Sequence, residues 1–205
     1  MHTKQPFFAH IDVLNGRDTM ASALCDRLVT EKRTELARDF NLVAGRFFAG
    51  LAQMIPQHAV TFGTAANAIT MSQPTDESFI VVMQKFQESG AENTTVAELV
   101  RAENERLFTT VLPQVAAQTT MATELLPLCV AWQSISEASR RNVWAYLKRM
   151  VVATTAYATV SQPLPDAAKA ELAANVQRGE AFVKQYILKH GNPPSMQEIA
   201  EFMRS

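Results

Sequence analysis

The 205-residue chain is poor in glycine and histidine, and it contains no long apolar run. Its seven glycines are few, and no turn dipeptide joins two segments of alternating hydrophobicity, which argues against a fold of β-hairpins. The apolar runs are interrupted well before the roughly 20 residues that a membrane-spanning helix needs, so no membrane partner is expected. The first residues also lack the apolar segment of a secretory signal, which predicts an intracellular protein that is not secreted.

Cysteine is scarce as well, with Cys25 and Cys129 far apart in the chain. Each lies among apolar residues and has no second cysteine or histidine nearby in the sequence. This context favours two small buried thiols over a disulfide or a redox pair, and it suits a reducing compartment.

Neither sign of charge dominates, because 19 Lys and Arg residues oppose 20 Asp and Glu residues for a net charge of -1. The whole chain therefore lacks the electrostatic footprint of a nucleic-acid-binding protein, and such binding would need a local patch. Hydrophobic residues make up 47% and charged residues 19%, which is enough apolar surface for a core and excludes wholesale disorder.

Motifs that carry chemistry are missing. None of the four histidines has the spacing to an acid or a second histidine that builds a metal site on one helix face. Gly45 and Gly50 lack the lysine of a phosphate loop, and no Gly-x-Ser-x-Gly nucleophile motif occurs. The acids and arginines between Glu98 and Arg106 are three apart, as in solvated ion pairs on a helix. We therefore expect no enzyme, no catalytic or metal-binding residue and no cofactor.

Helical spacing is what the sequence does contain. Residues 1–17 are predicted to form an irregular arm that ends in an Asn-Gly turn. Apolar residues three and four apart follow within residues 18–55, and Pro56 ends this stretch. The stretch is either one helix or two, with the polar residues 30–34 as the expected break.

Three capping signals mark further helices. Thr95 with Glu98 and Ser195 with Glu198 form capping boxes, and Ser136 opens a third helix. The apolar run of residues 79–83 is predicted to be helical, because no partner strand is evident. The pattern predicts an all-α fold, a single compact multi-helix bundle over residues 18–190, followed by a docked C-terminal helix at 191–205. Whether that helix packs in cis or on a second copy stays open.

The helix that starts at Ser136 is the most specific segment. Its apolar positions, with a tryptophan before the helix, predict a core element: Trp132, Val143, Trp144, Tyr146, Leu147 and Met150. Its basic residues define a candidate binding face, which we name the α-helical basic face: Arg140, Arg141, Lys148 and Arg149. This face is either an ordinary solvated surface or a contact for phosphate or an acidic partner.

The same segment resembles a signature of uncharacterised helical proteins of nucleocytoplasmic large DNA viruses (giant and algal viruses). Those proteins carry a helix with the pattern Ile/Val-Trp-x-Tyr-Leu that a serine opens, and an earlier tryptophan that Trp132 matches. Ala145 and Lys148 depart from the lysine and glutamine usual there. The resemblance covers roughly residues 36–160, and it implies a shared origin and fold but no activity.

The resemblance and the lack of catalytic motifs together predict a non-enzymatic viral protein that binds other proteins. It would act as a virion component or as a factor in the infected host cytoplasm, with a homo-oligomer as a further alternative. The competing hypothesis is a nucleic-acid-associated protein that uses the α-helical basic face and the C-terminal helix. Residues 188–203 resemble the first half of a helix-turn-helix, although the second helix needed to enter a major groove does not follow.

Overall fold

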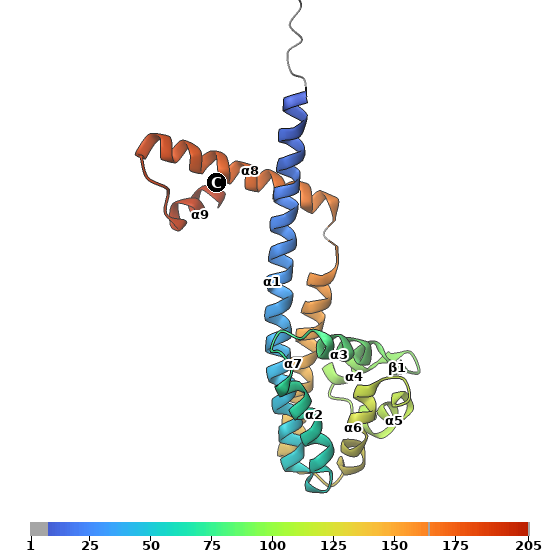
Figure 1. Cartoon of the computed structure of the whole chain (residues 1–205). Coiled ribbons are helices and arrows are strands. Elements are labelled where there is room, and N and C mark those ends of the chain that lie inside the picture. Colours follow the sequence, from blue (N-terminus) through green and yellow to red (C-terminus); the bar gives the residue numbers. More distant parts are fainter. Residues whose placement is uncertain (1–7, 164, 205) are drawn as a thin grey trace, which may run out of the picture. The chain divides into compact units, whose positions relative to one another are not determined.

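Helices form most of the described chain, and a computed structural model confirms the predicted all-α fold class (Figure 1). The structure describes residues 8–163 and 165–204, with most side chains placed from Asp26 onward. The elements in chain order are α1 (Phe8–Met54), the 3₁₀ helix η1 (Pro56–His58), α2 (Ala59–Met71), α3 (Ser78–Glu88), β1 (Gly90–Ala91), β2 (Thr94–Thr95), α4 (Val96–Arg101), the π-helix η2 (Leu107–Val111), α5 (Leu112–Val115), α6 (Thr120–Ala131), α7 (Glu137–Ser161), α8 (Asp166–His190) and α9 (Met196–Arg204).

The first helix begins earlier than predicted. The irregular arm expected at residues 1–17 is wrong for residues 8–17, which belong to α1, while residues 1–7 lie outside the described part of the chain. The Asn-Gly pair at 15–16 does not end the helix, because one interior glycine costs only about 1 kcal/mol relative to alanine.

The polar stretch at residues 30–34 does not break α1 either. Thr30 Oγ1 donates to the Asp26 carbonyl at 2.7 Å, and Lys32 pairs with Glu35 at 2.7 Å. Both contacts join residues three or four apart, the spacing that a helix brings together. One helix, α1, therefore covers residues 18–54, and the alternative of two helices is wrong.

The chain divides into two compact units, and this division corrects the predicted bundle of residues 18–190. One unit is Glu31–Gln162, and the other groups the residues up to Thr30 with Pro163–Ser205. Residues 163–190 therefore belong with the C-terminal helix and not with the main core.

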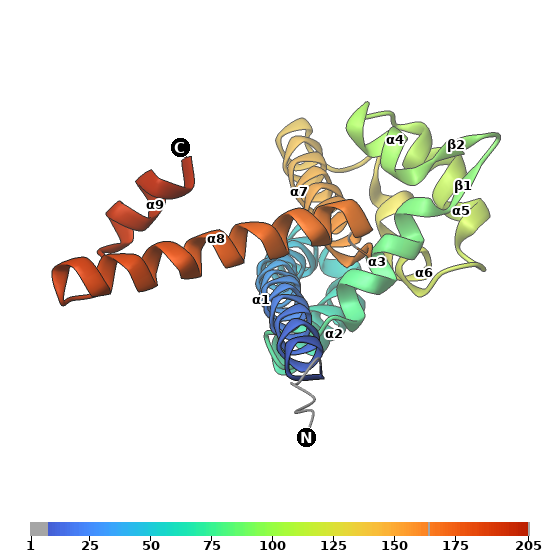
Figure 2. The ribbon, with the colours of Figure 1, turned by 90° about the horizontal axis from the view of Figure 1, so that it is seen from above.

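The main core lies in the unit Glu31–Gln162. Within this unit, α3 to α6 and the short hairpin gather on one flank of α1 and α7 (Figure 2). The long helix α1 and the shorter elements after it both contribute the largest fully buried side chains, which are Phe40, Phe47, Phe48, Leu51, Ile55, Phe62, Ile80, Met83, Phe86, Leu107, Phe108 and Trp132. Residues 79–83 are helical within α3, as predicted.

The polar loop after α3 holds a two-residue antiparallel hairpin that the sequence analysis did not predict. Glu92 and Asn93 turn the chain with φ of 53° and 62°, the left-handed geometry of tight hairpin turns. Gly90 is required, since a Cβ there would lie 2.2 Å from the Thr94 carbonyl oxygen. An Asn-Gly pair would have signalled such a turn, whereas Glu-Asn does not.

The helices after the hairpin are also more broken than the pattern suggested. The capping box of Thr95 and Glu98 is confirmed, and the helix that it opens, α4, ends after six residues at Arg101. Glu103, at φ of 50°, redirects the chain into η2. The last helix before α7, α6, contains Pro127 in its interior.

The second unit contains the helical pair α8 and α9. Gly191 ends α8 with φ of 74°, and Ser195 and Glu198 form the predicted capping box at the start of α9. Phe202 stacks on Phe182 with ring centroids 4.2 Å apart. The C-terminal helix therefore docks in cis, on α8.

Candidate functional site

The helix singled out by the sequence is α7, and it is a core element as predicted. The Ser136 hydroxyl accepts a hydrogen bond from the Ser139 amide at 3.1 Å and so caps the helix. Five of the predicted core residues are buried, Tyr146 is half-buried and Ser136 is exposed: the buried five are Trp132, Val143, Trp144, Leu147 and Met150.

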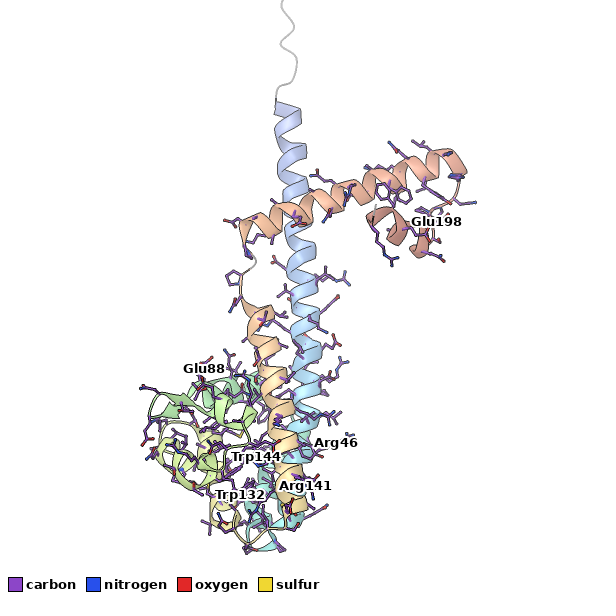
Figure 3. All side chains as sticks on the ribbon, turned by 180° about the vertical axis from the view of Figure 1, so that it is seen from behind. Arg46, Glu88, Trp132, Arg141, Trp144 and Glu198 are labelled. Carbon is purple, nitrogen blue, oxygen red and sulfur yellow. The ribbon has the colours of Figure 1, made fainter. Side chains whose placement is uncertain are left out.

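The two tryptophans share one aromatic cluster. Trp132 stacks on Phe108 at 3.9 Å between ring centroids and meets Trp144 edge-on at 5.6 Å, where α6 and α7 adjoin (Figure 3). Arg140 lies over the Trp132 ring at 5.6 Å, within range of a cation–π contact. This part of the predicted signature stabilises the fold and offers no open site.

The α-helical basic face does not form one free cationic surface. Arg140 pairs with Glu105 at 3.2 Å, and Lys148 pairs with Glu103 at 2.5 Å. Both carboxylates come from the turn between α4 and η2, so these cations tie that turn to α7. Arg141 has only a 3.8 Å contact with Glu137, and Arg149 is exposed.

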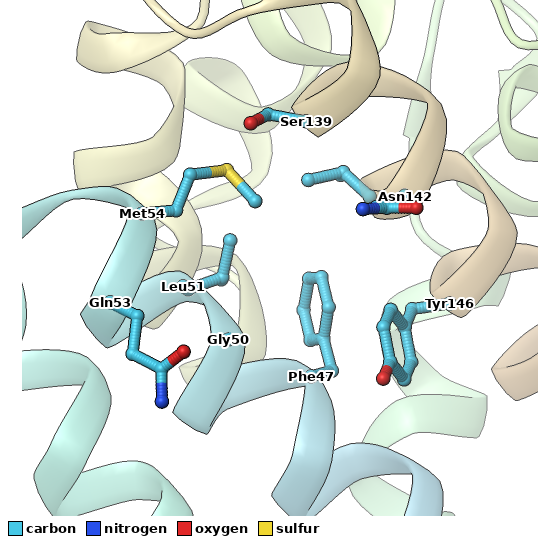
Figure 4. A pocket seen from close by; sticks show the side chains of 9 residues that line it. Phe47, Gly50, Leu51, Gln53, Met54, Ser139, Asn142 and Tyr146 are labelled. Carbon is cyan, nitrogen blue, oxygen red and sulfur yellow. The ribbon is translucent and has the colours of Figure 1, made fainter.

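A pocket of about 380 Å³ opens between α1 and α7 (Figure 4). Phe47 and Tyr146 lie side by side in its lining, with ring centroids 5.9 Å apart. Its other walls are apolar or carry uncharged amides and hydroxyls: Gly50, Leu51, Gln53, Met54, Ser139, Asn142 and Val143. No carboxylate, histidine, lysine or arginine lines it, so Tyr146 is the one group of this lining that general acid–base catalysis could use.

One cluster of titratable groups is buried in part, and it connects α1, α7 and the residues before α3. Glu77 accepts from both Arg33 and the Tyr157 hydroxyl, and Arg33 Nη2 also donates to that hydroxyl at 2.9 Å. Burial raises the pKa of Tyr157 above its ordinary value, and the bond to Glu77 raises it further. None of these three residues lines the α1–α7 pocket. The cluster therefore links α1 to α7 and to the start of α3.

Other classes of site are not found in the described chain. No three of its histidines, cysteines, aspartates and glutamates lie close enough together to hold a metal ion. Among the same residues, no helix combines the length and hydropathy needed to cross a bilayer.

A groove of about 550 Å³ lies between α1 and α2, and we name it the α1–α2 groove. One stripe of α1 lines it, with residues three and four apart: Arg38, Asn41, Leu42, Gly45, Arg46 and Ala49. The opposite wall is the end of α2 and the following loop: Ile69, Thr70, Ser72 and Pro74. Leu42 is 54% exposed here, although it lies beside a fully apolar face of the same helix.

Two features define the walls of this groove. A Cβ at Gly45 would lie 3.4 Å from Thr70 Oγ1 and 3.8 Å from Ile69 Cγ2, which is ordinary van der Waals contact, so α1 and α2 are close neighbours at this point. The buried Asn41 amide donates to the Pro74 and Asp76 carbonyls at 3.2 and 2.9 Å, which holds the loop in place. The groove is therefore preformed.

The sequence analysis did not predict this groove. Its available signal was Leu42, an apolar residue outside the stripe of Phe40, Val43 and Phe47, but an isolated exposed leucine is common on protein surfaces. No family model, curated protein or solved structure matches this chain.

Proposed function

We propose that this protein is a non-catalytic binding protein, and that it binds a partner protein through the α1–α2 groove. The observation that carries the proposal is an exposed apolar residue in that groove: Leu42 is 54% exposed, and Gly45 and Ala49 continue its line along α1. Covering an exposed leucine and its apolar surroundings is favourable by about 25 cal/mol for each Å² removed from water.

The linings of the α1–α7 pocket and the α1–α2 groove favour binding over catalysis. The α1–α7 pocket carries no charged group, and the α1–α2 groove carries arginines but no carboxylate, histidine or cysteine. Binding of a protein needs only shape, apolar area and a polar rim, and the groove has all three.

The nucleic-acid alternative receives less support from the geometry. Two of the four basic residues proposed for it, Arg140 and Lys148, are engaged by Glu105 and Glu103. Affinity for phosphates depends on several unpaired cations that act together. The viral origin and the virion or infected-cell role stay predictions from the sequence.

The test is site-specific photo-crosslinking in lysate of the native source. A photoreactive amino acid at Leu42 should capture a defined partner protein, and the same group at Val152, which is 69% exposed on α7, should not. A further Arg46→Glu change should reduce capture at position 42. Identical products at both positions, or no product at position 42, would contradict the proposal.

A salt-dependent shift of labelled DNA or RNA tests the alternative, since phosphate contacts release counterions. A shift that Arg141→Glu with Arg149→Glu abolishes would favour the nucleic-acid hypothesis over the groove.

A further inference from the structure

The α1–α2 groove has a specific charge pattern. Arg38 and Arg46 both line it and both are exposed, and Leu42 lies midway between them, four residues from each. Eight residues at 1.5 Å per residue separate the two arginines by about 12 Å along the helix axis. No carboxylate lines the groove, so its lining carries two positive charges.

Glu35, three residues before Arg38, pairs with Lys32 at 2.7 Å. The hydrogen bond from Lys32 is the main cause that lowers the pKa of Glu35, and the charge of Arg38 is the smallest cause. Within the described chain, no carboxylate lies within ion-pair distance of Arg46. Arg46 also lies on the side of α1 away from α3 to α6 (Figure 3).

We infer that the occupant of this groove is an acidic amphipathic helix of a partner protein, an inference that rests on the proposed function. The stripe from Arg38 to Ala49 is about 17 Å long at 1.5 Å per residue, which matches about three turns of a docked helix. A helix in a groove anchors itself through apolar residues three and four apart. Those residues would cover the exposed Leu42 and Ala49.

Charge complementarity sets the remaining positions. Two carboxylates seven or eight residues apart on one face of the partner helix would meet Arg38 and Arg46, one on each side of the apolar anchor. Guanidinium groups pair with carboxylates in a planar, two-bonded geometry, so both Asp and Glu suit these positions. Two cations beside an apolar floor are a poor match for a nucleic-acid backbone, which requires a longer row of cations and no apolar floor.

The experiment is selection from a displayed library of helix-forming peptides of about 14 residues, with the full chain as bait. Peptides enriched on the wild-type protein should carry two acids seven or eight apart that flank apolar residues. Their binding should weaken about a hundredfold with Arg38→Glu plus Arg46→Glu, because two charge pairs turn repulsive. The matched control, Arg141→Glu plus Arg149→Glu, makes the same change of net charge outside the groove and should leave binding within about twofold.

Several results would overturn the inference. These are selected peptides without an acidic preference, a selection that yields no binder, and equal loss of binding in both double variants. Displacement of the selected peptide by a DNA duplex or by phosphatidylserine vesicles, or self-association of the chain that Arg46→Glu abolishes, would assign the groove to a different occupant. If crosslinking at Leu42 captures a partner while selection shows no acidic preference, only this inference fails and the proposed function stands.

Discussion

Replacing Trp132 with alanine tests whether the aromatic cluster is the centre of the core. Trp132 is 0% exposed, and it contacts Phe108 and Trp144. Removing about 200 Å² of buried apolar surface at about 25 cal/mol per Å² costs about 5 kcal/mol. Part of that cost is offset, because the buried indole Nε1 finds no hydrogen-bond acceptor among the described residues and so carries an unmet desolvation cost of about 1–2 kcal/mol.

We therefore expect Trp132→Ala to lower the free energy of unfolding by about 3–4 kcal/mol, in line with other large aromatic truncations. Trp132→Phe should cost less than about 1.5 kcal/mol, because it retains the stacking on Phe108 and removes the unpaired N–H. Urea unfolding followed by far-ultraviolet circular dichroism measures both changes, and an unchanged slope with urea shows that the midpoint reports stability.

The matched control is Val130→Ala, two residues away and 82% exposed. It should change the free energy of unfolding by less than about 0.5 kcal/mol. A loss below about 1 kcal/mol for Trp132→Ala, or an equal loss for the control, would refute the reasoning from burial.

Three further predictions concern an ion pair, a buried thiol and a hydrogen-bonded carboxylate. The Arg140–Glu105 pair, partly exposed at 3.2 Å, should show a coupling of at most about 1 kcal/mol in a double-mutant cycle, and added salt should reduce it. Burial raises the pKa of Cys129 from 9.0 to about 11, so in a Cys25→Ser protein the native thiol should react with a disulfide reagent about a hundredfold more slowly than in urea. Because that pKa is raised by folding, stability should be unaffected below pH 9 and should fall as the pH rises from 9 toward 11. A hydrogen bond from Tyr186, and to a smaller extent those from Ser195, lower the pKa of Glu198 from 4.5 to about 2. The docking of α9 on α8 should therefore weaken as the pH falls from 4.5 toward 2. Near-ultraviolet circular dichroism measures this transition, and Glu198→Gln should remove it.

Local signals in the sequence predicted the helix starts well. Ser136, Thr95 and Ser195 each cap a helix as expected, because a capping bond joins residues only three apart and needs no tertiary context. The burial of Trp144 and Leu147 followed from helical periodicity for the same reason.

The neutralisation of the basic face could not be predicted in this way. Lys148 meets Glu103, a residue 45 positions earlier, only because the chain reverses direction there with φ of 50°. A glutamate gives no sequence signal for left-handed backbone, since asparagine and glycine are the usual residues at such positions. The α1–α2 groove was missed for a related reason, because its second wall depends on how α2 packs on α1.

Asn41 connects the folding of this chain to the kinetics of binding. Its two hydrogen bonds to the Pro74 and Asp76 carbonyls order one wall of the α1–α2 groove before any partner arrives. The entropy of ordering that loop is lost once, when the chain folds, and does not oppose each association. Asn41→Ala would release the wall, so a partner would bind more slowly and dissociate sooner even though the groove kept both of its arginines and Leu42.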